Sequence, residues 1–350
     1  MVKYRLATYK DNDQLLKLTS ATAMPGTISL RIDRFPDFFR LNELRGETKV
    51  YAAEDNGLII GCISVSRQNV YLLNKAHPMW YVSDLRVAAT HQKKGIALGL
   101  VQETYKYLKR VEADILFVNV AEGNKRPFVF LCESASYPDF QSLGVFKVVQ
   151  FLGSDKTNKS FEYQIRETKA NNENIEFLNA YYSKYELASL ITHDKVKNTQ
   201  LFEVRYQDKL IAVMCLVDTM NMKQNVIVKL PWFLEKMVMV LNRMSLMLKI
   251  SKLPQKNEAI NMLYIKYLAV KDLNRDLISE LITHAQHCAF LKSYSFVSIG
   301  LHEKDDLLKY LPLKIRFTFN STGLIVSLKD NQDLLRKIIN GVPYKDYSIV

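Results

Sequence analysis

A short glycine-containing turn between an apolar stretch and a long amphipathic stretch has the chemistry to bind a phosphate group. Residues 81–87 read Tyr-Val-Ser-Asp-Leu-Arg-Val, and residues 92–97 read Gln-Lys-Lys-Gly-Ile-Ala. The first stretch predicts a strand, and residues 96–111 predict a helix, so the turn leads into a helix N-terminus. The first N–H groups of a helix have no internal partner, and together with the helix dipole they form a site suited to an anion.

The side chains of this turn fit a phosphate ligand. Gly95 allows a close approach of the backbone, and Ala97 keeps the first helical turn unobstructed. Lys93 and Lys94 add positive charge at the same place. Asp84, on the predicted strand just before the turn, is a carboxylate that could accept a proton from an attacking amine. The alternative is that Asp84 only orders a loop or pairs with an arginine.

Strand and helix patterns alternate over the first half of the chain. An Asn-Gly pair at 56–57 marks the turn of a hairpin. Strands are predicted at 3–8, 48–53, 58–66, 80–87, 114–120, 145–151 and 160–165, and helices at 11–23, with Asp11 as the cap, 36–45 and 96–111.

A similar order of elements recurs about 180 residues later, which indicates a long-period duplication. The segment 82–120 resembles 265–301 in its strand–helix–strand order. Helices are predicted at 173–189 and 273–291, and strands at 202–206, 210–216, 262–270, 295–300, 315–320 and 324–328.

The turn and its context resemble the pyrophosphate-binding motif of the GNAT acyltransferases. That motif is Gln or Arg, two residues, Gly, one residue, then Gly or Ala. Here it corresponds to Gln92, Gly95 and Ala97, after Val87 at the end of the fourth strand. The resemblance implies a three-layer α+β fold of two GNAT-like acyl-CoA N-acyltransferase domains, each a mixed, mostly antiparallel sheet flanked by helices.

The resemblance also implies where acyl-CoA, the co-substrate, binds. Its pyrophosphate would lie on the amides of the loop 92–97, and its pantetheine arm would pair with the strand backbone at 85–87. The fifth strand, around 117–120, would diverge to make room. The implied cofactor-binding residues are Leu85, Arg86, Val87, Gln92, Lys93, Lys94, Gly95, Ile96, Ala97 and Asn124.

The implied reaction moves an acetyl or other short acyl group from acyl-CoA to a primary amine by direct attack. An amine with a pKa of about 10.4 must first lose a proton, and Asp84 is the best-placed carboxylate. The family often has a tyrosine acid about seven residues after the asparagine. Here that position is Leu131, and Tyr137 is a substitute only if the segment is rearranged. A non-catalytic acyl-CoA-binding regulatory or scaffold protein is therefore the alternative function.

The matching turn of the second half, residues 270–277, has lost these features. It contains no glycine, and Asp272 and Asp276 lie where a phosphate would sit. Two carboxylates there would repel a pyrophosphate. We therefore predict a degenerate GNAT-like domain that supports the first one and forms a wall of its acceptor cleft.

A polar stretch at 169–174 best separates a catalytic domain, 1–168, from this degenerate domain, 169–350. The segment at about 226–256 is basic, rich in Met and Leu and predicted to be helical, and it looks like an insertion. It could lie on a membrane or line a tunnel for an apolar acceptor. Alternatively, it packs between domains or across a homodimer.

Composition restricts the other classes of function. The net charge of +12 is spread over both halves without a basic or aromatic motif, so no nucleic acid is expected as a partner. No apolar run is long enough for a spanning helix, and the N-terminus does not resemble a secretion signal. The four cysteines form no CxxC pair, which favours free thiols and a cytoplasmic location. His284, His287 and Cys288 share a predicted helical face without an evident fourth ligand, so no metal site is expected.

Overall fold

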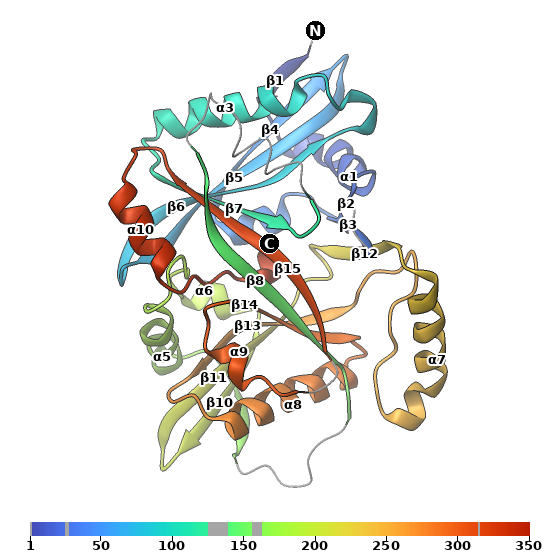
Figure 1. The fold of residues 1–350 in the computed structure, drawn as a ribbon, viewed down its shortest axis with the longest axis vertical. Coiled ribbons are helices and arrows are strands. Elements are labelled where there is room, and N and C mark those ends of the chain that lie inside the picture. Colours follow the sequence, from blue (N-terminus) through green and yellow to red (C-terminus); the bar gives the residue numbers. More distant parts are fainter. Residues whose placement is uncertain (1, 25–27, 125–138, 156–162, 314–315) are drawn as a thin grey trace.

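The computed structural model describes residues 2–24, 28–124, 139–155, 163–313 and 316–350 (Figure 1). The main sheet contains β1 (Lys3–Leu6), β4 (Glu47–Asp55), β5 (Leu58–Leu72), β6 (Lys75–Val87), β7 (Ile115–Ala121), β8 (Gln141–Leu152), β9 (Ile165–Thr168), β10 (Gln200–Tyr206), β11 (Lys209–Asp218), β13 (Met262–Val270), β14 (Phe296–His302) and β15 (Arg316–Ser327). A smaller sheet contains β2 (Ala23–Met24), β3 (Ser29–Asp33) and β12 (Gln224–Lys229). The α-helices are α1 (Asn12–Ser20), α2 (Arg40–Arg45), α3 (Ile96–Arg110), α5 (Asn172–Tyr182), α6 (His193–Val196), α7 (Trp232–Leu248), α8 (Arg275–Leu291), α9 (Leu307–Tyr310) and α10 (Gln332–Asn340).

Within the described residues the main sheet is continuous and symmetric in its order. From one edge it runs β1-β4-β5-β6-β7, then β15-β8, then β14-β13-β11-β10-β9. The first and last groups repeat the same succession from the edge inward. In each group the innermost pair, β6 with β7 and β13 with β14, is parallel. This order confirms the predicted mixed sheet and its repeat.

Helices cover both faces of the sheet in each half. On β5, α1 packs through Leu15 on one face and α3 packs through Leu100 on the other. On β11, α8 packs through Leu281 on one face and α5 packs through Tyr181 on the other. Because both faces are buried, β11 and β13 are nearly continuous apolar runs.

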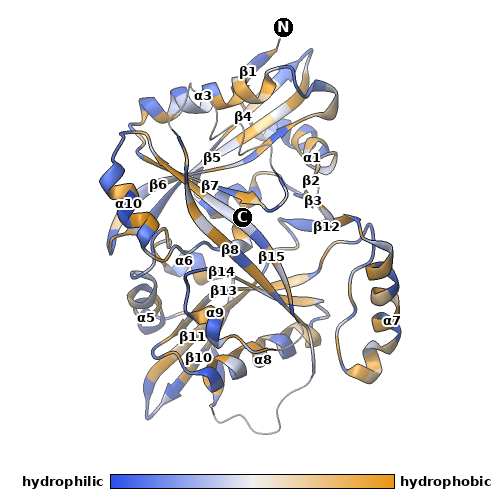
Figure 2. Ribbon diagram, in the orientation of Figure 1, coloured by the Kyte–Doolittle hydropathy of each residue, from blue (hydrophilic) through white to orange (hydrophobic). Residues whose placement is uncertain are grey.

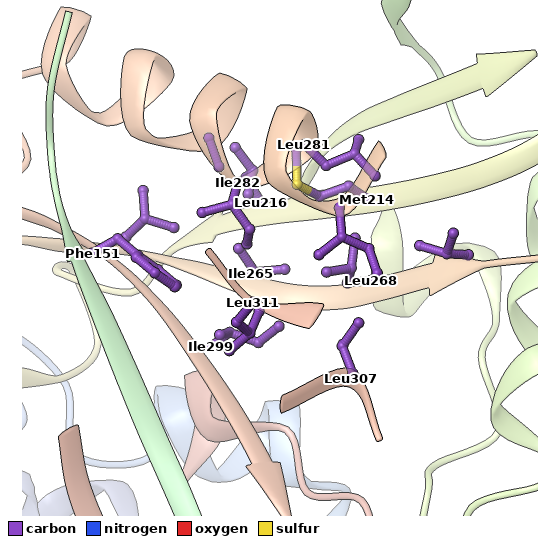
Figure 3. Packing of buried hydrophobic residues seen from close by; sticks show 14 of the residues in the cluster. Phe151, Met214, Leu216, Ile265, Leu268, Leu281, Ile282, Ile299, Leu307 and Leu311 are labelled. Atoms are coloured by element: carbon purple, nitrogen blue, oxygen red, sulfur yellow. The ribbon is translucent and has the colours of Figure 1, made fainter. Parts of the chain in front are cut away.

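The two halves exchange strands at the centre of the sheet. The last strand, β15, pairs with β7 of the first half, and β8 of the first half pairs with β14 of the second. β15 and β8 also pair with each other. Figure 3 shows the result in the core, where Phe151 of β8 lies among Leu216, Leu281 and Ile299 of the second half. Each half therefore needs a strand from the other to complete its sheet.

The predicted boundary between two domains at 168/169 stays a proposal, and strands on each side of it pair with strands of the other half. β9 precedes that division in the sequence but pairs with β10 of the second half. β12 follows it but pairs with β3 of the first half, with Val226 opposite Arg31. The two halves are joined in both sheets.

Several predicted elements differ in extent from the structure. The last two predicted strands form one strand, β15. It stays paired with both β7 and β8 across the predicted turn at 321–323, and the register with β8 shifts at Gly323. The helix predicted to reach residue 189 ends at Tyr182, because Leu187 and Ala188 instead bond to the backbone of Tyr71. The helix predicted from residue 36 begins at Arg40.

The predicted helical segment at 226–256 contains a helix only at 232–248, since residues 224–229 form β12. α7 lies at the edge of the molecule (Figure 1). Among the helices of the described residues, none is both long and apolar enough to cross a membrane.

We expect Gly323→Val to destabilise both halves together. A Cβ at Gly323 would lie 2.8 Å from a ring carbon of Phe146 and 3.1 Å from one of Phe117, so a larger side chain overpacks the centre of the sheet. The free energy of unfolding should fall by about 1–3 kcal/mol.

Urea unfolding followed by far-UV circular dichroism and by the fluorescence of Trp80 and Trp232 should shift in one coincident transition. Thr318→Val, at an exposed position of the same strand, is the control and should change stability by less than about 0.5 kcal/mol. Two separate transitions, with only one shifted, would contradict a shared sheet.

Candidate functional site

The N-terminus of α3 is open. Gly95 is its N-cap residue, with a left-handed backbone (φ 76°), and as a glycine it provides no side-chain cap for the first helical amides. A Cβ at Gly95 would meet no described atom within 4 Å. Lys93, Lys94 and Gly95 are all exposed. The amides of the first turn therefore face open space beside two cations, as an anion site requires.

The corresponding helix of the second half is closed by its own cap. The side chain of Asn274 accepts hydrogen bonds from the amides of Asp276 (2.8 Å) and Leu277 (3.1 Å). Asp276 adds a negative charge in the same turn. In α8 the equivalent first-turn amides therefore already have a hydrogen-bond acceptor. This contact explains the difference between the halves more directly than the repulsion predicted from Asp272 and Asp276.

β6 and β7 diverge where the site begins. Their parallel pairing ends at Val82 and Val118, although β6 continues to Val87 and β7 to Ala121. Beyond this point β6 stays paired with β5, and β7 stays paired with β15. In the part of the chain that the structure describes, the edge of residues 83–87 that faces β7 pairs with no strand. An unpaired edge of this kind can bind an extended ligand.

The structure brings the predicted cofactor residues to one end of the sheet. Because β6 and β7 are parallel, their carboxyl ends leave the sheet at the same edge. Leu85 is exposed, and the carbonyl of Val87 accepts a hydrogen bond from the Gln92 amide (3.3 Å). Asn124 follows the end of β7, and its N–H donates to the carbonyl of Ala121 (3.1 Å). Leu131 and Tyr137 lie outside the described residues.

Two of the predicted cofactor residues use their side chains elsewhere. The guanidinium of Arg86 donates to the carbonyls of Thr19 (3.4 Å) and Thr22 (3.2 Å) at the end of α1. The side chain of Ile96 is buried in the core beneath α3, while Ala97 is partly buried beside it. Arg86 and Ile96 thus offer a ligand mainly their backbone, and the role of every residue in this set stays a prediction.

Asp84 lies in a bulge of β6 and is held by two arginines. Asp84 and Leu85 together oppose one residue of β5, and the backbone of Asp84 is left-handed (φ 55°). Its carboxylate accepts from Nη1 of Arg34 (3.1 Å) and Nη1 of Arg45 (2.6 Å). Burial by itself would raise the pKa of Asp84, but the nearby arginines outweigh it, and the pKa lies well below its usual range. These ion pairs match the alternative that Asp84 pairs with an arginine. They argue against Asp84 as a proton acceptor, and that catalytic role stays a prediction.

Asp84 is part of a group of charges that sequence reasoning missed. We call Arg34, Arg45, Lys223 and Lys345 the buried cation cluster, because all four are at most 5% exposed. Burial lowers the pKa values of Lys223 and Lys345 to about 7. These cations are scattered over the sequence and resemble ordinary surface charges. One indication of these cations was present in the sequence, because a carboxylate in the predicted buried strand at Asp84 would need a positively charged partner.

The cluster holds the last residues of the chain against the diverging strands. Arg45 donates Nε to the carbonyl of Ile349 (2.7 Å), and Lys223 donates Nζ to that of Tyr347 (3.0 Å). The ammonium of Lys345 lies 3.8 Å from the ring centre of Tyr81 in β6. The C-terminal residue lies near the centre of the molecule (Figure 1). Residues from both halves therefore meet beside the end of the β6–β7 pairing.

The described residues form neither a cluster for a metal ion nor a disulfide. Among the residues that the structure describes, no three His, Cys, Asp or Glu side chains gather to hold a metal ion. The ring of His284 packs against Phe202, with 4.7 Å between ring centres. Cys62, Cys215 and Cys288 are free thiols, and Cys132 lies outside the described residues.

One family model matches the part of the chain that contains the helix α3 and the turn before it. Residues 15–127 match the model of the acetyltransferase (GNAT) family. The matched region contains the bulge of β6, the turn and the whole of α3. The match supports acyl transfer from CoA, because members of the GNAT family are generally N-acyltransferases.

Several solved acyltransferase structures share the fold of nearly the whole chain. The N-myristoyltransferase of Saccharomyces cerevisiae with bound myristoyl-CoA is 12% identical, with a TM-score of 0.59 over 93% of this chain and 78% of that one. A GCN5-related N-acetyltransferase of Anabaena variabilis ATCC 29413 is 11% identical, with a TM-score of 0.54 over 93% and 72%. A probable N-acyltransferase of Enterococcus faecalis V583 is 8% identical, with a TM-score of 0.53 over 93% and 72%. At these identities the likeness concerns the fold, and it confirms the predicted α+β GNAT-like architecture. No curated protein sequence matches the chain significantly.

We expect Asp84→Asn to destabilise the protein by about 3–5 kcal/mol, because it leaves Arg34 and Arg45 buried without a counter-charge. The loss should depend on pH with a defined sign. Asp84 has a lower pKa in the folded than in the unfolded protein, so its stabilising effect is complete above an unfolded pKa of about 3.9. The effect is lost as the pH falls through the lower folded value. The difference in unfolding free energy between the two proteins should therefore be largest above about pH 4 and shrink below it.

Urea titrations between pH 5 and pH 3 measure this difference. Lys223 and Lys345 do not interfere, because groups with pKa values near 7 and above are already protonated below pH 5 in both states. Asp13→Asn, at an exposed carboxylate of α1, is the matched control and should have little effect at any pH. A constant difference across the whole range would contradict a charged Asp84.

Proposed function

We propose that this protein transfers an acetyl or other short acyl group from acyl-CoA to a primary amine by direct attack. The observation that carries this proposal is the open N-terminus of α3 directly beyond the point where β6 and β7 diverge. One feature suits a pyrophosphate, and the other suits an extended arm that ends in a thioester. A cytoplasmic location remains a prediction.

Each part of the cofactor has a partner of fitting chemistry. The pyrophosphate would lie on the amides of the loop from Gln92 to Ala97, with Lys93 and Lys94 beside it. The pantetheine arm carries amides that can pair with the open backbone edge of Leu85, Arg86 and Val87 in the manner of an added strand. Asn124, three residues after the end of β7, would bond to the same arm. The thioester would then lie toward Asp84 and the buried cation cluster.

The cluster is suited to the charge that develops during acyl transfer. Attack of an amine on a thioester places negative charge on the carbonyl oxygen, and fixed positive charges in a buried site stabilise it. Asp84 stays the predicted base, although its arginines compete for the carboxylate. Lys345 is a second candidate, because burial lowers its pKa to about 7 and leaves much of it neutral at that pH.

We expect Gly95→Glu to weaken CoA binding at least tenfold, or about 1.4 kcal/mol, because it places a carboxylate at the open amides of α3. Isothermal titration calorimetry with CoA measures the change. Gly57→Glu is a matched control, because Gly57 is also an exposed glycine with a positive φ (79°) and nothing within 4 Å of its Cβ. The control should bind CoA like the unsubstituted protein. Unchanged affinity in Gly95→Glu would exclude this turn as the phosphate site.

We expect release of free thiol from acetyl-CoA when a panel of primary amines is added. The panel should contain small amines, aminoglycosides and lysine peptides, because the acceptor is not fixed by the proposal. Thiol release that requires both the amine and an intact Gly95 supports the transferase.

The alternative is a non-catalytic acyl-CoA-binding regulatory or scaffold protein. It is favoured by the absence of a tyrosine at position 131 and by the ion pairs of Asp84. Calorimetric binding of CoA that is lost in Gly95→Glu, without turnover of any amine or acyl chain length, would support this alternative.

A further inference from the structure

α7 carries an unusual concentration of exposed apolar side chains. The helix spans Trp232 to Leu248 and lies at the edge of the molecule, and Figure 2 shows much of it in hydrophobic colours. Its large apolar residues with high exposed fractions are Trp232 (69%), Phe233 (55%), Met237 (39%), Met239 (67%), Val240 (56%), Met244 (37%), Leu246 (90%) and Met247 (72%).

These residues form one face of the helix. The opposite face holds α7 to the protein, where Val238 and Leu241 pack against the core and Ser245 is buried. Asn242 fixes the returning chain through two hydrogen bonds to the backbone of Leu253, at 2.7 and 2.9 Å. The exposed face is therefore the outer side of an ordered helix and not a frayed segment. An exposed face with so many large apolar side chains indicates an interaction surface.

The charge around this face has one sign. Residues 226–256 contain six basic residues, Lys229, Lys236, Arg243, Lys249, Lys252 and Lys256, and one acidic residue, Glu235. Lys236 and Arg243 are seven residues apart and exposed, so they lie on the outer face among the apolar side chains. The ammonium of Lys236 lies 5.2 Å from the ring centre of Trp232.

Charge decides between the partners that an apolar face could bind. Two copies of the chain packed α7 to α7 would bring two basic faces together, which like-charge repulsion opposes. An anionic bilayer surface suits both features at once. Trp232, Phe233 and the methionines can enter the boundary of the acyl chains, while the long stems of Lys236 and Arg243 reach up to the phosphates.

We propose that α7 docks this protein onto a bilayer surface that contains anionic lipid. The helix has 17 residues and a length of about 25 Å, so it suits a position in the plane of the interface. Docking would also fix the orientation of the candidate site. Lys223 of the buried cation cluster directly precedes β12, which leads into α7. Gln224 bonds to the backbone of Phe35, next to Arg34 of the same cluster.

Flotation of the full chain with vesicles tests the proposal. We expect at least tenfold tighter binding to vesicles of phosphatidylcholine with phosphatidylserine than to phosphatidylcholine alone, and a decrease with added salt. Lys236→Glu with Arg243→Glu should reduce binding to the anionic vesicles at least tenfold. Trp232→Ser with Phe233→Ser should reduce it similarly, and because these side chains are exposed, both variants should keep the thermal unfolding midpoint.

Two controls separate docking by α7 from other causes. Lys109→Glu with Arg110→Glu changes the net charge equally at exposed positions of α3 and should bind vesicles like the unsubstituted protein. Gly95→Glu should also bind normally, so failure of the proposed CoA site leaves this test intact. Equal binding to both kinds of vesicle, an equal loss in the α3 control, or no vesicle binding would each overturn the proposal. So would a dimer that forms without lipid and disappears in Trp232→Ser with Phe233→Ser.

Discussion

The pairing of β15 with both β7 and β8 is the constraint on which the rest of the structure depends. A strand has two edges, and β7 satisfies one of them with β15 as far as Ala121. Because β15 still holds β7 in the sheet as far as Ala121, β7 can separate from β6 after Val118, and in the described chain the facing backbone groups of β6 and β7 then have no strand partner. The open edge of β6, where the pantetheine arm is proposed to bind, thus depends on a strand that the second half contributes.

The same exchange brings the end of the chain to the candidate site. β15 leads into α10, and the chain then returns across the sheet so that Lys345 lies over Tyr81. Tyr347 donates to Asn119 of β7 at 3.3 Å. Buried charges are expensive unless they are paired or hydrogen-bonded. The ion pairs of Asp84 and the carbonyl acceptors of Arg45 and Lys223 meet that requirement, and they also fix the last residues in place.

The two halves differ in the residue that caps the helix between their parallel strands. Both contain a parallel strand pair connected by a long helix, α3 in the first half and α8 in the second. At Gly95 the backbone turns with a positive φ, and the cap residue has no side chain to bond to the amides. At Asn274 a side-chain oxygen occupies them. An anion must displace that oxygen to bind at α8, whereas at α3 it meets open amides.

The sequence by itself determined the local features. The glycine of the turn, the apolar strand before it and the amphipathic helix after it are contiguous, and their periodicities predict β6, α3 and the anion site between them. The second copy was visible for the same reason, because its order of elements repeats. Only the tertiary structure decided that β8 and β15 are exchanged, since the strands that pair there are separated by more than a hundred residues and local patterns carry no information on such partners. It also decided that Asp84 lies between Arg34 and Arg45 and that Lys223 and Lys345 are buried beside it. These charges come from distant segments, and their burial depends on the packing of both halves around them.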